Sequence, residues 1–122
     1  IMKRLILAVK EFYKKFSHDL PHADKYERAQ FRFDCLKEEN EEYLAAVLAD
    51  DKIEIADALG DMLYVLCGTI IEHELQDKIE EVFDEIHRSN MTKIYEDGFI
   101  KKSFNYSKPR IKKIFEIFEP TG

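Results

Sequence analysis

The chain has 122 residues, enough for one domain with a hydrophobic core and too few for two domains of ordinary size. Hydrophobic residues make up 45% of it, which argues against intrinsic disorder, and the 4 Gly and 3 Pro are too few for a turn-rich all-β fold. The net charge of −6 argues against a general polyanion binder, so we expect no nucleic-acid partner.

Apolar residues recur at helical spacing along most of the chain. They predict helices at residues 2–16, 24–49, 52–74 and 78–94, with breaks at 17–22, 50–51 and 76–77. The sequence Glu96-Asp97-Gly98 predicts a turn, and a last short helix is predicted at residues 111–118 within a basic tail, 96–122. Four helices with short connections predict an all-α fold, an antiparallel four-helix bundle, as a single domain over residues 1–122.

The third predicted helix is apolar almost all round from residue 53 to residue 71, so we expect it to be buried on most sides. One small bundle does not readily bury so many apolar and aromatic side chains. We therefore expect a homodimer or a higher oligomer that completes the bundle. No apolar run approaches the ~20 residues that span a bilayer, and residues 1–12 are interpreted as a helix and not as a signal peptide. A cytoplasmic protein without a membrane partner is expected.

Acidic residues are concentrated in one segment. Nine carboxylates and one lysine lie between residues 38 and 61, for a local net charge of −8. An antiparallel pairing through residues 50–51 would place Glu42 near Asp57, and Glu39 near Asp61, inside the bundle. Carboxylates this close repel one another unless protons or cations neutralise them, and an all-oxygen site suits Mg²⁺ or Mn²⁺.

The same acids allow two other interpretations. Carboxylates on helices are often simply solvated, and this remains an alternative for the group. A ferritin-like di-iron bundle needs Glu-x-x-His on two helices, and this chain offers only Asp84-x-x-His87. The di-iron interpretation is therefore rejected.

Three stretches carry a family resemblance. They are Leu36-Lys37-Glu38-Glu39-Asn40-Glu41-Glu42-Tyr43, Glu54-Ile55-Ala56-Asp57-Ala58-Leu59-Gly60-Asp61-Met62-Leu63-Tyr64-Val65, and Ser89-Asn90-Met91-Thr92-Lys93. Together they resemble the all-α nucleoside triphosphate pyrophosphohydrolases, which include MazG proteins, phosphoribosyl-ATP pyrophosphohydrolases and dimeric dUTPases. The resemblance implies a MazG-like bundle and a homodimer or homotetramer. It also implies Mg²⁺-dependent hydrolysis of a nucleoside triphosphate to the monophosphate and pyrophosphate, as nucleotide-pool house-cleaning.

Carried onto this sequence, the family's E-x-x-E motif falls on Glu39 and Glu42 as metal ligands. Glu38, the acid before them, is a candidate catalytic base for the attacking water. The second acidic motif fits two registers: Glu54-x-x-Asp57 matches it literally, whereas alignment on the residues after Asp61 puts an alanine, Ala58, in the glutamate position. We favour Asp57 and Asp61 as metal-facing over Glu54. The departure at Ala58 leaves open a non-catalytic nucleotide-binding or metal-binding relative, and a plain helical interaction module is a third hypothesis.

Basic residues gather near the C-terminal end, where residues 87–113 hold eight bases and two acids. Lys93 follows Asn90 by three residues and so shares its helix face. We interpret Asn90 as a contact to the base or ribose and Lys93 as a contact to phosphate, with Lys102 and Tyr106 closing over the nucleotide. The alternative is a solvated basic face. Aromatic side chains at positions 12 and 16 would stack on a base or pack in the core.

Overall fold

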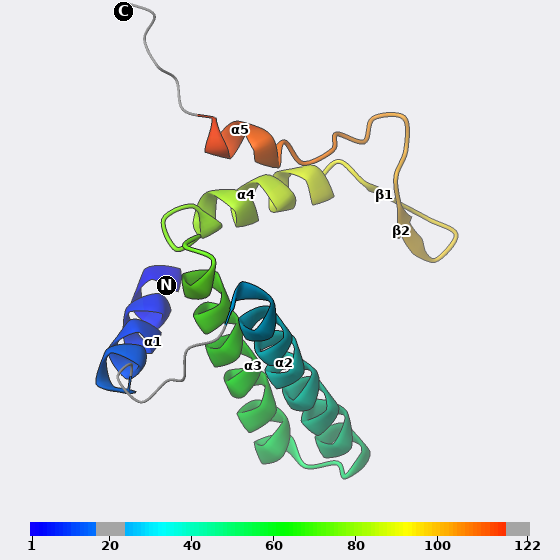
Figure 1. Ribbon diagram of the computed structural model, residues 1–122. Coiled ribbons are helices and arrows are strands. Elements are labelled where there is room, and N and C mark those ends of the chain that lie inside the picture. The colour runs from blue at the N-terminus through cyan, green and yellow to red at the C-terminus, as the bar shows by residue number, and fades with distance from the viewer. Residues whose placement is uncertain (17–23, 117–122) are drawn as a thin grey trace, which may run out of the picture. The chain divides into compact units, whose positions relative to one another are not determined.

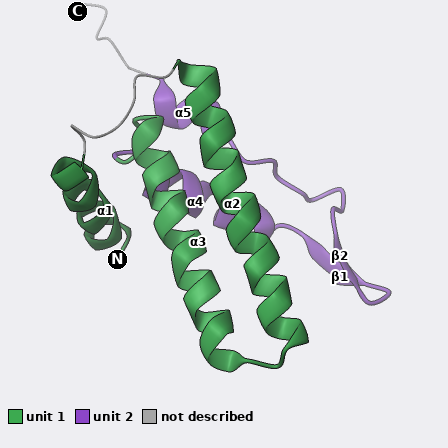
Figure 2. Cartoon of the chain, turned by 60° about the horizontal axis from the view of Figure 1, so that its bottom comes forward, with its two compact units in different colours: residues 1–76 green, residues 77–122 purple. Residues whose placement is uncertain are grey.

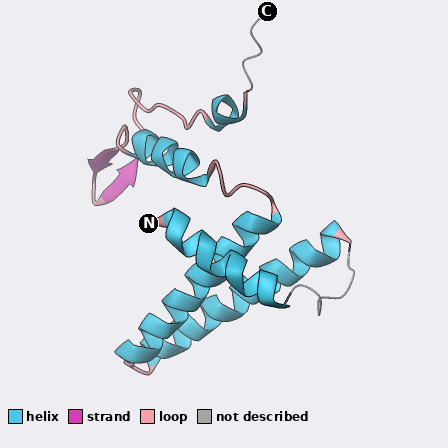
Figure 3. Ribbon diagram, turned by 90° about the vertical axis from the view of Figure 1, so that its left-hand side faces the viewer, coloured by secondary structure: helices cyan, strands magenta, loops and turns pink. Residues whose placement is uncertain are grey.

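The computed structural model describes residues 1–16 and 24–116 of the chain, so the predicted break at 17–22 lies outside the described residues. The chain divides into two compact units, 1–76 and 77–122 (Figure 2). The first unit contains α1 (Met2–Phe16), α2 (Lys25–Leu48) and α3 (Lys52–Glu72). The second contains α4 (Ile79–Asn90), β1 (Ile94–Glu96), β2 (Phe99–Lys101) and α5 (Ile111–Phe115). The all-α fold class is confirmed, and the only strands among the described residues form one short hairpin (Figure 3).

Helix α2 begins where an aspartate caps it. The side chain of Asp24 accepts hydrogen bonds from the backbone N–H groups of Tyr26 and Glu27, both at 2.9 Å. Such a cap satisfies donors that have no partner within the first turn of a helix, and its removal costs about 1 kcal/mol. The predicted helix begins at residue 24, whereas α2 begins at Lys25, because Asp24 caps the helix and is not part of it.

The connection between α2 and α3 has the form predicted for Asp50-Asp51. Asp50 adopts a left-handed conformation with φ of 52°, and the N–H of Asp51 donates to the carbonyl of Ala46 at 3.1 Å. This geometry ends a helix by pairing its last carbonyls. The Asp51 side chain then accepts from the N–H groups of Ile53 and Glu54, which caps α3. So short a link makes the two helices antiparallel neighbours (Figure 1).

The buried core of the described residues is small. Helix α1 packs against α3, and the buried apolar side chains are Ile6, Val9, Ala46, Ala58, Cys67 and Ile70. The expectation that α3 is buried on most sides is wrong for the single chain, because α1 and α2 cover only part of its circumference. Leu59, Leu63 and Leu66 remain 49%, 41% and 44% exposed.

The fourth helix ends earlier than residue 94, where it was predicted to end. Helix α4 stops at Asn90, and Ile94 to Glu96 pair antiparallel with Phe99 to Lys101. Asp97 and Gly98 have φ of 55° and 83°, the left-handed pair that a two-residue hairpin turn requires. The turn at Asp97-Gly98 is therefore confirmed. It joins two strands, which the apolar spacing did not predict.

Two further boundaries differ slightly from the prediction. Helix α3 ends at Glu72 and not at residue 74, because Glu74 has φ of 56° and the N–H of Leu75 donates to the carbonyl of Ile70. Helix α5 ends at Phe115, and residues 117 and 118 of its predicted range lie outside the described residues. None of the helices within 1–16 and 24–116 is both long enough and apolar enough to cross a membrane.

Candidate metal centre

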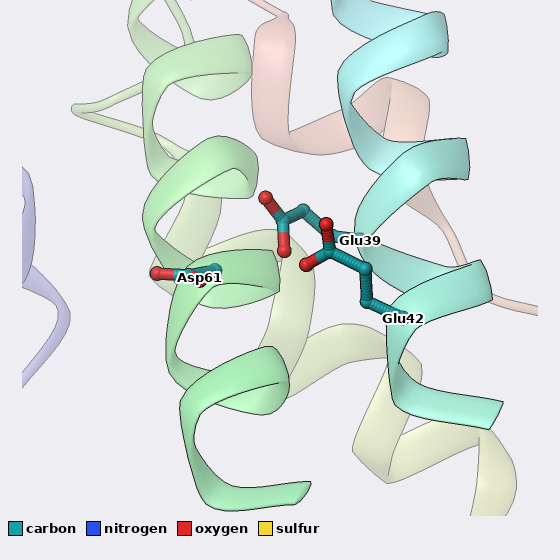
Figure 4. A group of neighbouring side chains, drawn as sticks. All are labelled: Glu39, Glu42 and Asp61. Carbon is teal, nitrogen blue, oxygen red and sulfur yellow. The ribbon is translucent and has the colours of Figure 1, made fainter. Parts of the chain in front are cut away.

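Three carboxylates meet between α2 and α3. One oxygen atom from each of Glu39, Glu42 and Asp61 lies within 4.8 Å of the other two. Figure 4 shows the two glutamates extending from α2 toward the helix that carries Asp61. We call this group the carboxylate cluster. Other acidic, histidine or cysteine side chains of the described residues form no comparable group.

The sequence brings these residues together through the helix link. Glu39 and Glu42 are three positions apart, so they share one face of α2. Glu39 lies eleven residues before Asp50, and Asp61 lies eleven residues after it. In two antiparallel helices with a tight connection, residues at equal distance from the turn lie at the same level. The predicted pairing of Glu39 with Asp61 is therefore found in the structure.

The cluster places Glu39 in an unfavourable environment for a negative charge. Burial raises the pKa of this carboxyl group, and the hydrogen bond with Glu42 and the charges of Glu42, Asp61 and Glu38 raise the pKa further. In the absence of a cation, the ionised form is therefore disfavoured here. A site of this kind is neutralised either by a proton or by a metal ion.

The donor set fits a hard divalent cation. The Oε2 atom of Glu39 is buried and has no hydrogen-bond partner among the described residues. A buried carboxylate oxygen without a partner is costly unless a ligand satisfies it. Three carboxylates supply only oxygen atoms, which are the ligands that Mg²⁺ and Mn²⁺ prefer. Glu39, Glu42 and Asp61 therefore fit such an ion.

The other acids predicted for the site lie outside the cluster. Glu54 and Asp57 are exposed and line a cleft of about 420 Å³ between α2 and α3, which also includes Glu42. Ala58, in the position where the alternative register would need a glutamate, lines the same cleft and is only 3% exposed. Glu38 is exposed on α2, next in sequence to Glu39. The geometry thus favours the register with Asp61 and leaves Asp57 beside it on the same helix.

In the second unit, two of the predicted substrate residues are in contact. The ammonium group of Lys102 lies 4.8 Å from the centre of the Tyr106 ring. A hydrogen bond from the hydroxyl of Ser89, at 3.5 Å, lowers the pKa of Tyr106, and the charges of Lys102, Lys93 and Lys108 add to this effect. Lys93 is half-buried, and its charge acts on the same phenol.

The remaining motif residues show one role that the sequence did not assign. Asn90 is exposed at the end of α4, whereas Ser89 is 1% exposed. The hydroxyl of Thr92 donates to the carbonyl of Ser89 at 2.7 Å and accepts from the N–H of Ser107 at 2.8 Å. The Ser89 and Thr92 side chains thus fix the helix end and the segment that carries Tyr106. The sequence feature that could have indicated this role is the presence of both residues within Ser89-Asn90-Met91-Thr92-Lys93.

Phe12 and Phe16 of α1 do not form the core. Phe12 and Phe16 are 45% and 40% exposed, and their ring centres lie 5.0 Å apart. Phe12 also contacts Tyr64 of α3 edge to face, at 5.7 Å. Both rings therefore remain accessible to a planar ligand, as the base-stacking interpretation requires, and that interpretation stays a prediction.

The comparisons with known proteins give one family match. A family model described as phosphoribosyl-ATP pyrophosphohydrolase matches residues 9–90, a range that includes the whole carboxylate cluster. Neither the curated proteins nor the solved structures gave a significant match. The matched range covers more than half of the chain. The chain therefore belongs to the phosphoribosyl-ATP pyrophosphohydrolase family, within the all-α nucleoside triphosphate pyrophosphohydrolases, and this membership implies a pyrophosphohydrolase enzyme.

Proposed function

We propose that the protein hydrolyses the bond between the α and β phosphates of a nucleoside triphosphate in a Mg²⁺-dependent reaction, releasing the monophosphate and pyrophosphate. The observation that carries the proposal is the carboxylate cluster. The buried Oε2 atom of Glu39 has no hydrogen-bond partner among the described residues, and the carboxylates of the cluster repel one another. Neither feature stabilises a helix pair, and a bound cation would account for both. Mn²⁺ is the alternative ion.

In this proposal, Glu39, Glu42 and Asp61 hold the cation. Asp57 lies one helical turn from Asp61 and is proposed as a further ligand. Glu54, on the turn beyond Asp57, is the less favoured candidate ligand. A divalent cation bound here supplies positive charge against the phosphate oxygens and against the charge that develops during the reaction.

Glu38 is proposed as the general base. It is exposed and adjacent in sequence to Glu39, so it is available to the water molecule that attacks the triphosphate. Its carboxylate takes one proton from that water as the new phosphorus–oxygen bond forms. The bond between the α and β phosphates breaks at the same time, and its electron pair leaves with pyrophosphate.

Asn90, Lys93, Lys102 and Tyr106 are proposed to bind the nucleotide. The contact between Lys102 and Tyr106 and the charge of Lys93 near the same phenol support a role in holding an anion. Asn90 offers an amide for the base or the ribose. A role in cytoplasmic nucleotide-pool house-cleaning follows if free nucleoside triphosphates are the substrates.

The family match supports a second candidate substrate, phosphoribosyl-ATP, because the matching family is described by that activity. This compound also carries a triphosphate chain and would also release pyrophosphate. The carboxylate cluster serves both substrates equally, so the difference must come from the residues that contact the nucleoside.

We also propose that two or more copies of the chain associate, as a homodimer or homotetramer. The support is apolar surface: besides the leucines of α3, Phe31 and Phe33 of α2 are 61% and 62% exposed. Exposed apolar residues on adjoining helices are typical of interaction surfaces. Light scattering should give a mass at least twice that of the chain, and a mass of 14.5 kDa at every concentration would contradict this proposal.

The substrate proposal is tested with the wild-type protein and a panel of nucleoside triphosphates, deoxynucleoside triphosphates and phosphoribosyl-ATP. Pyrophosphate is measured with Mg²⁺ and again after addition of a chelator. Chelator-sensitive release supports the proposed function, and the preferred member of the panel identifies the substrate class. Nucleotide binding without release favours the non-catalytic relative, whereas neither binding nor release favours the helical interaction module.

A further inference from the structure

One cation in the first unit differs from all the others. Arg32 of α2 is half-buried, whereas every other lysine and arginine described in residues 1–76 is exposed. Burying a guanidinium group costs free energy because it loses part of its hydration. A half-buried guanidinium group therefore needs a compensating interaction. The groups that surround Arg32 indicate the role of this side chain.

The guanidinium group of Arg32 lies against two residues from other helices. Its central carbon is 5.0 Å from the centre of the Tyr13 ring, on α1. On α3, Gly68 leaves the space that both side chains enter. A Cβ atom at this glycine would overlap the Tyr13 hydroxyl and would lie 2.7 Å from Nη1 of Arg32. The hydroxyl and the guanidinium group thus converge on one point beside α3.

The contact with the Tyr13 ring uses none of the hydrogen-bond donors of Arg32. Within residues 1–16 and 24–116, Arg32 forms no hydrogen bond and no ion pair. A guanidinium group has five N–H donors in a planar fork, and the fork matches two oxygen atoms of a phosphate. Arg32 is therefore held against an aromatic ring, and no hydrogen bond or ion pair to the described residues uses its donors.

The position of Arg32 relates it to the carboxylate cluster. Arg32 lies seven residues before Glu39 on α2, and Gly68 lies seven residues after Asp61 on α3. Seven residues are two helical turns, so each pair shares one face of its helix at a separation of about 10 Å. The cation and the cluster consequently lie along the same side of the α2–α3 pair.

We propose that Arg32 and the hydroxyl of Tyr13 bind the terminal phosphates of the substrate, the part that leaves as pyrophosphate. This inference rests on the proposed pyrophosphohydrolase function and adds to it the residues that hold the leaving group. Three carboxylates and one divalent cation still leave a net negative charge, so phosphates bound there would gain from a further cation. Arg32 supplies one from the same unit, with Tyr13 adding a hydroxyl donor next to it.

The test measures the affinity of the full chain for inorganic pyrophosphate, by calorimetry in the presence of Mg²⁺. Arg32→Gln should weaken binding at least about tenfold, because charge-assisted hydrogen bonds are lost. Arg32→Lys should weaken binding less, since a point charge remains without the fork. Tyr13→Phe removes a single hydroxyl and should weaken binding about two- to fivefold. The matched control is Lys37→Gln, an exposed cation of the same helix that pairs with Glu41, and its affinity should change less than twofold.

A purely structural role for Arg32 makes a different prediction. Loss of Arg32 would then lower the melting temperature and weaken Mg²⁺ and pyrophosphate binding together. An equal loss of both affinities, or an equal effect of Arg32→Gln and Lys37→Gln on pyrophosphate, would overturn the proposal. If Arg32→Gln does not fold, the comparison of Arg32→Lys and Tyr13→Phe with the control decides in the same way.

The outcome is distinguishable from a failure of the proposed function, because pyrophosphate binding is measured without turnover. A wild-type chain that binds pyrophosphate through Arg32 but releases none from any triphosphate supports the Arg32 site and contradicts the proposed reaction. A chain that hydrolyses triphosphates with an unchanged KM in Arg32→Gln contradicts the Arg32 site and leaves the reaction standing.

Discussion

Glu39 on α2 and Asp61 on α3 bring carboxylate oxygens within 4.8 Å of each other, with Glu42 completing the group. Both lie eleven residues from Asp50, at which the chain reverses. A tight helix connection thus creates a concentration of negative charge that stability alone does not favour. The consequences of that charge can be measured both with and without a metal ion.

The first prediction concerns the stability of the metal-free protein. The pKa of Glu39 is raised from its ordinary value of 4.5, chiefly by burial, so the folded state binds this proton more tightly than the unfolded state. The resulting stabilisation is complete below about pH 4.5 and is lost as pH rises through the raised pKa. We therefore expect Glu39→Gln to gain stability relative to wild type as pH increases from 4.5 to 7.5, in urea unfolding with a chelator present. Glu41→Gln, on the exposed side of α2, is the control. A stability difference between Glu39→Gln and wild type that does not vary with pH would refute the prediction.

The second prediction distinguishes the two registers of the second acidic motif. A ligand that binds only the folded state at 100 times its Kd stabilises it by about 2.7 kcal/mol. Mg²⁺ should accordingly raise the melting temperature of the wild type, and Asp61→Asn should abolish that rise. Glu54→Gln should keep most of it, because Glu54 lies outside the carboxylate cluster. The opposite order of the two variants in a thermal melt would favour the Glu54-x-x-Asp57 register.

The third prediction compares two glycines of α3. Nothing lies within 4 Å of a Cβ atom built at Gly60, so Gly60→Ala should stabilise the protein by about 0.5–1 kcal/mol through helix propensity. At Gly68 a Cβ atom would overlap the Tyr13 hydroxyl, and Gly68→Ala should cost about 1–3 kcal/mol by overpacking. Denaturant unfolding measures both. An equal gain in the two variants would show that Tyr13 and Arg32 do not occupy the space beside Gly68.

The fourth prediction concerns the phenol of Tyr106. The hydroxyl of Ser89 donates to its oxygen and is the main cause of its lowered pKa. Ser89→Ala should raise the pKa of Tyr106 toward its ordinary value, as followed by NMR of labelled tyrosine rings with Tyr106→Phe for assignment. Ser103→Ala is the control, since that hydroxyl accepts from the N–H of Asn105 and does not contribute to the pKa of Tyr106. An unchanged titration in Ser89→Ala would disprove the hydrogen bond.

The fifth prediction tests the proposed base. Glu38→Gln should lower kcat at saturating Mg²⁺ by about 10²-fold or more, which is the usual contribution of general-base catalysis. The affinity for Mg²⁺ should change little, because Glu38 lies outside the carboxylate cluster. A metal-saturated kcat equal to that of wild type would remove Glu38 from the mechanism.

Local signals were sufficient for the parts of the fold that depend on neighbouring residues. The bounds of α1 and the reversal at Asp50-Asp51 follow from apolar spacing and from aspartate capping, and both are confirmed. The pairing of Glu39 with Asp61 follows from the same reversal, since two helices joined by a tight turn match residues at equal distance from it. The choice between Asp57 and Asp61 differs by a single helical turn, and helical spacing alone does not resolve it.

One local feature and two features that depend on distant residues were not predicted. The strands at Ile94 and Phe99 continue an apolar pattern that a helix also satisfies, and the Asp97-Gly98 turn was not recognised as a hairpin connection. The approach of Arg32 to Tyr13 depends on how three helices pack and on the missing side chain of Gly68. No spacing rule within one helix contains that information. The exposure of the α3 leucines likewise depends on which other helices pack against them, and the sequence of α3 alone does not predict this packing.

The central claim is that the carboxylate cluster is the metal centre of a pyrophosphohydrolase. Its most direct test is the rate of pyrophosphate release from the preferred triphosphate at saturating Mg²⁺, compared among wild type, Asp61→Asn and Glu41→Gln. We expect release by the wild type and by Glu41→Gln to be equal within about twofold. Release by Asp61→Asn should fall by at least about 10²-fold, as loss of a metal ligand requires. Equal rates in Asp61→Asn and wild type would contradict the account.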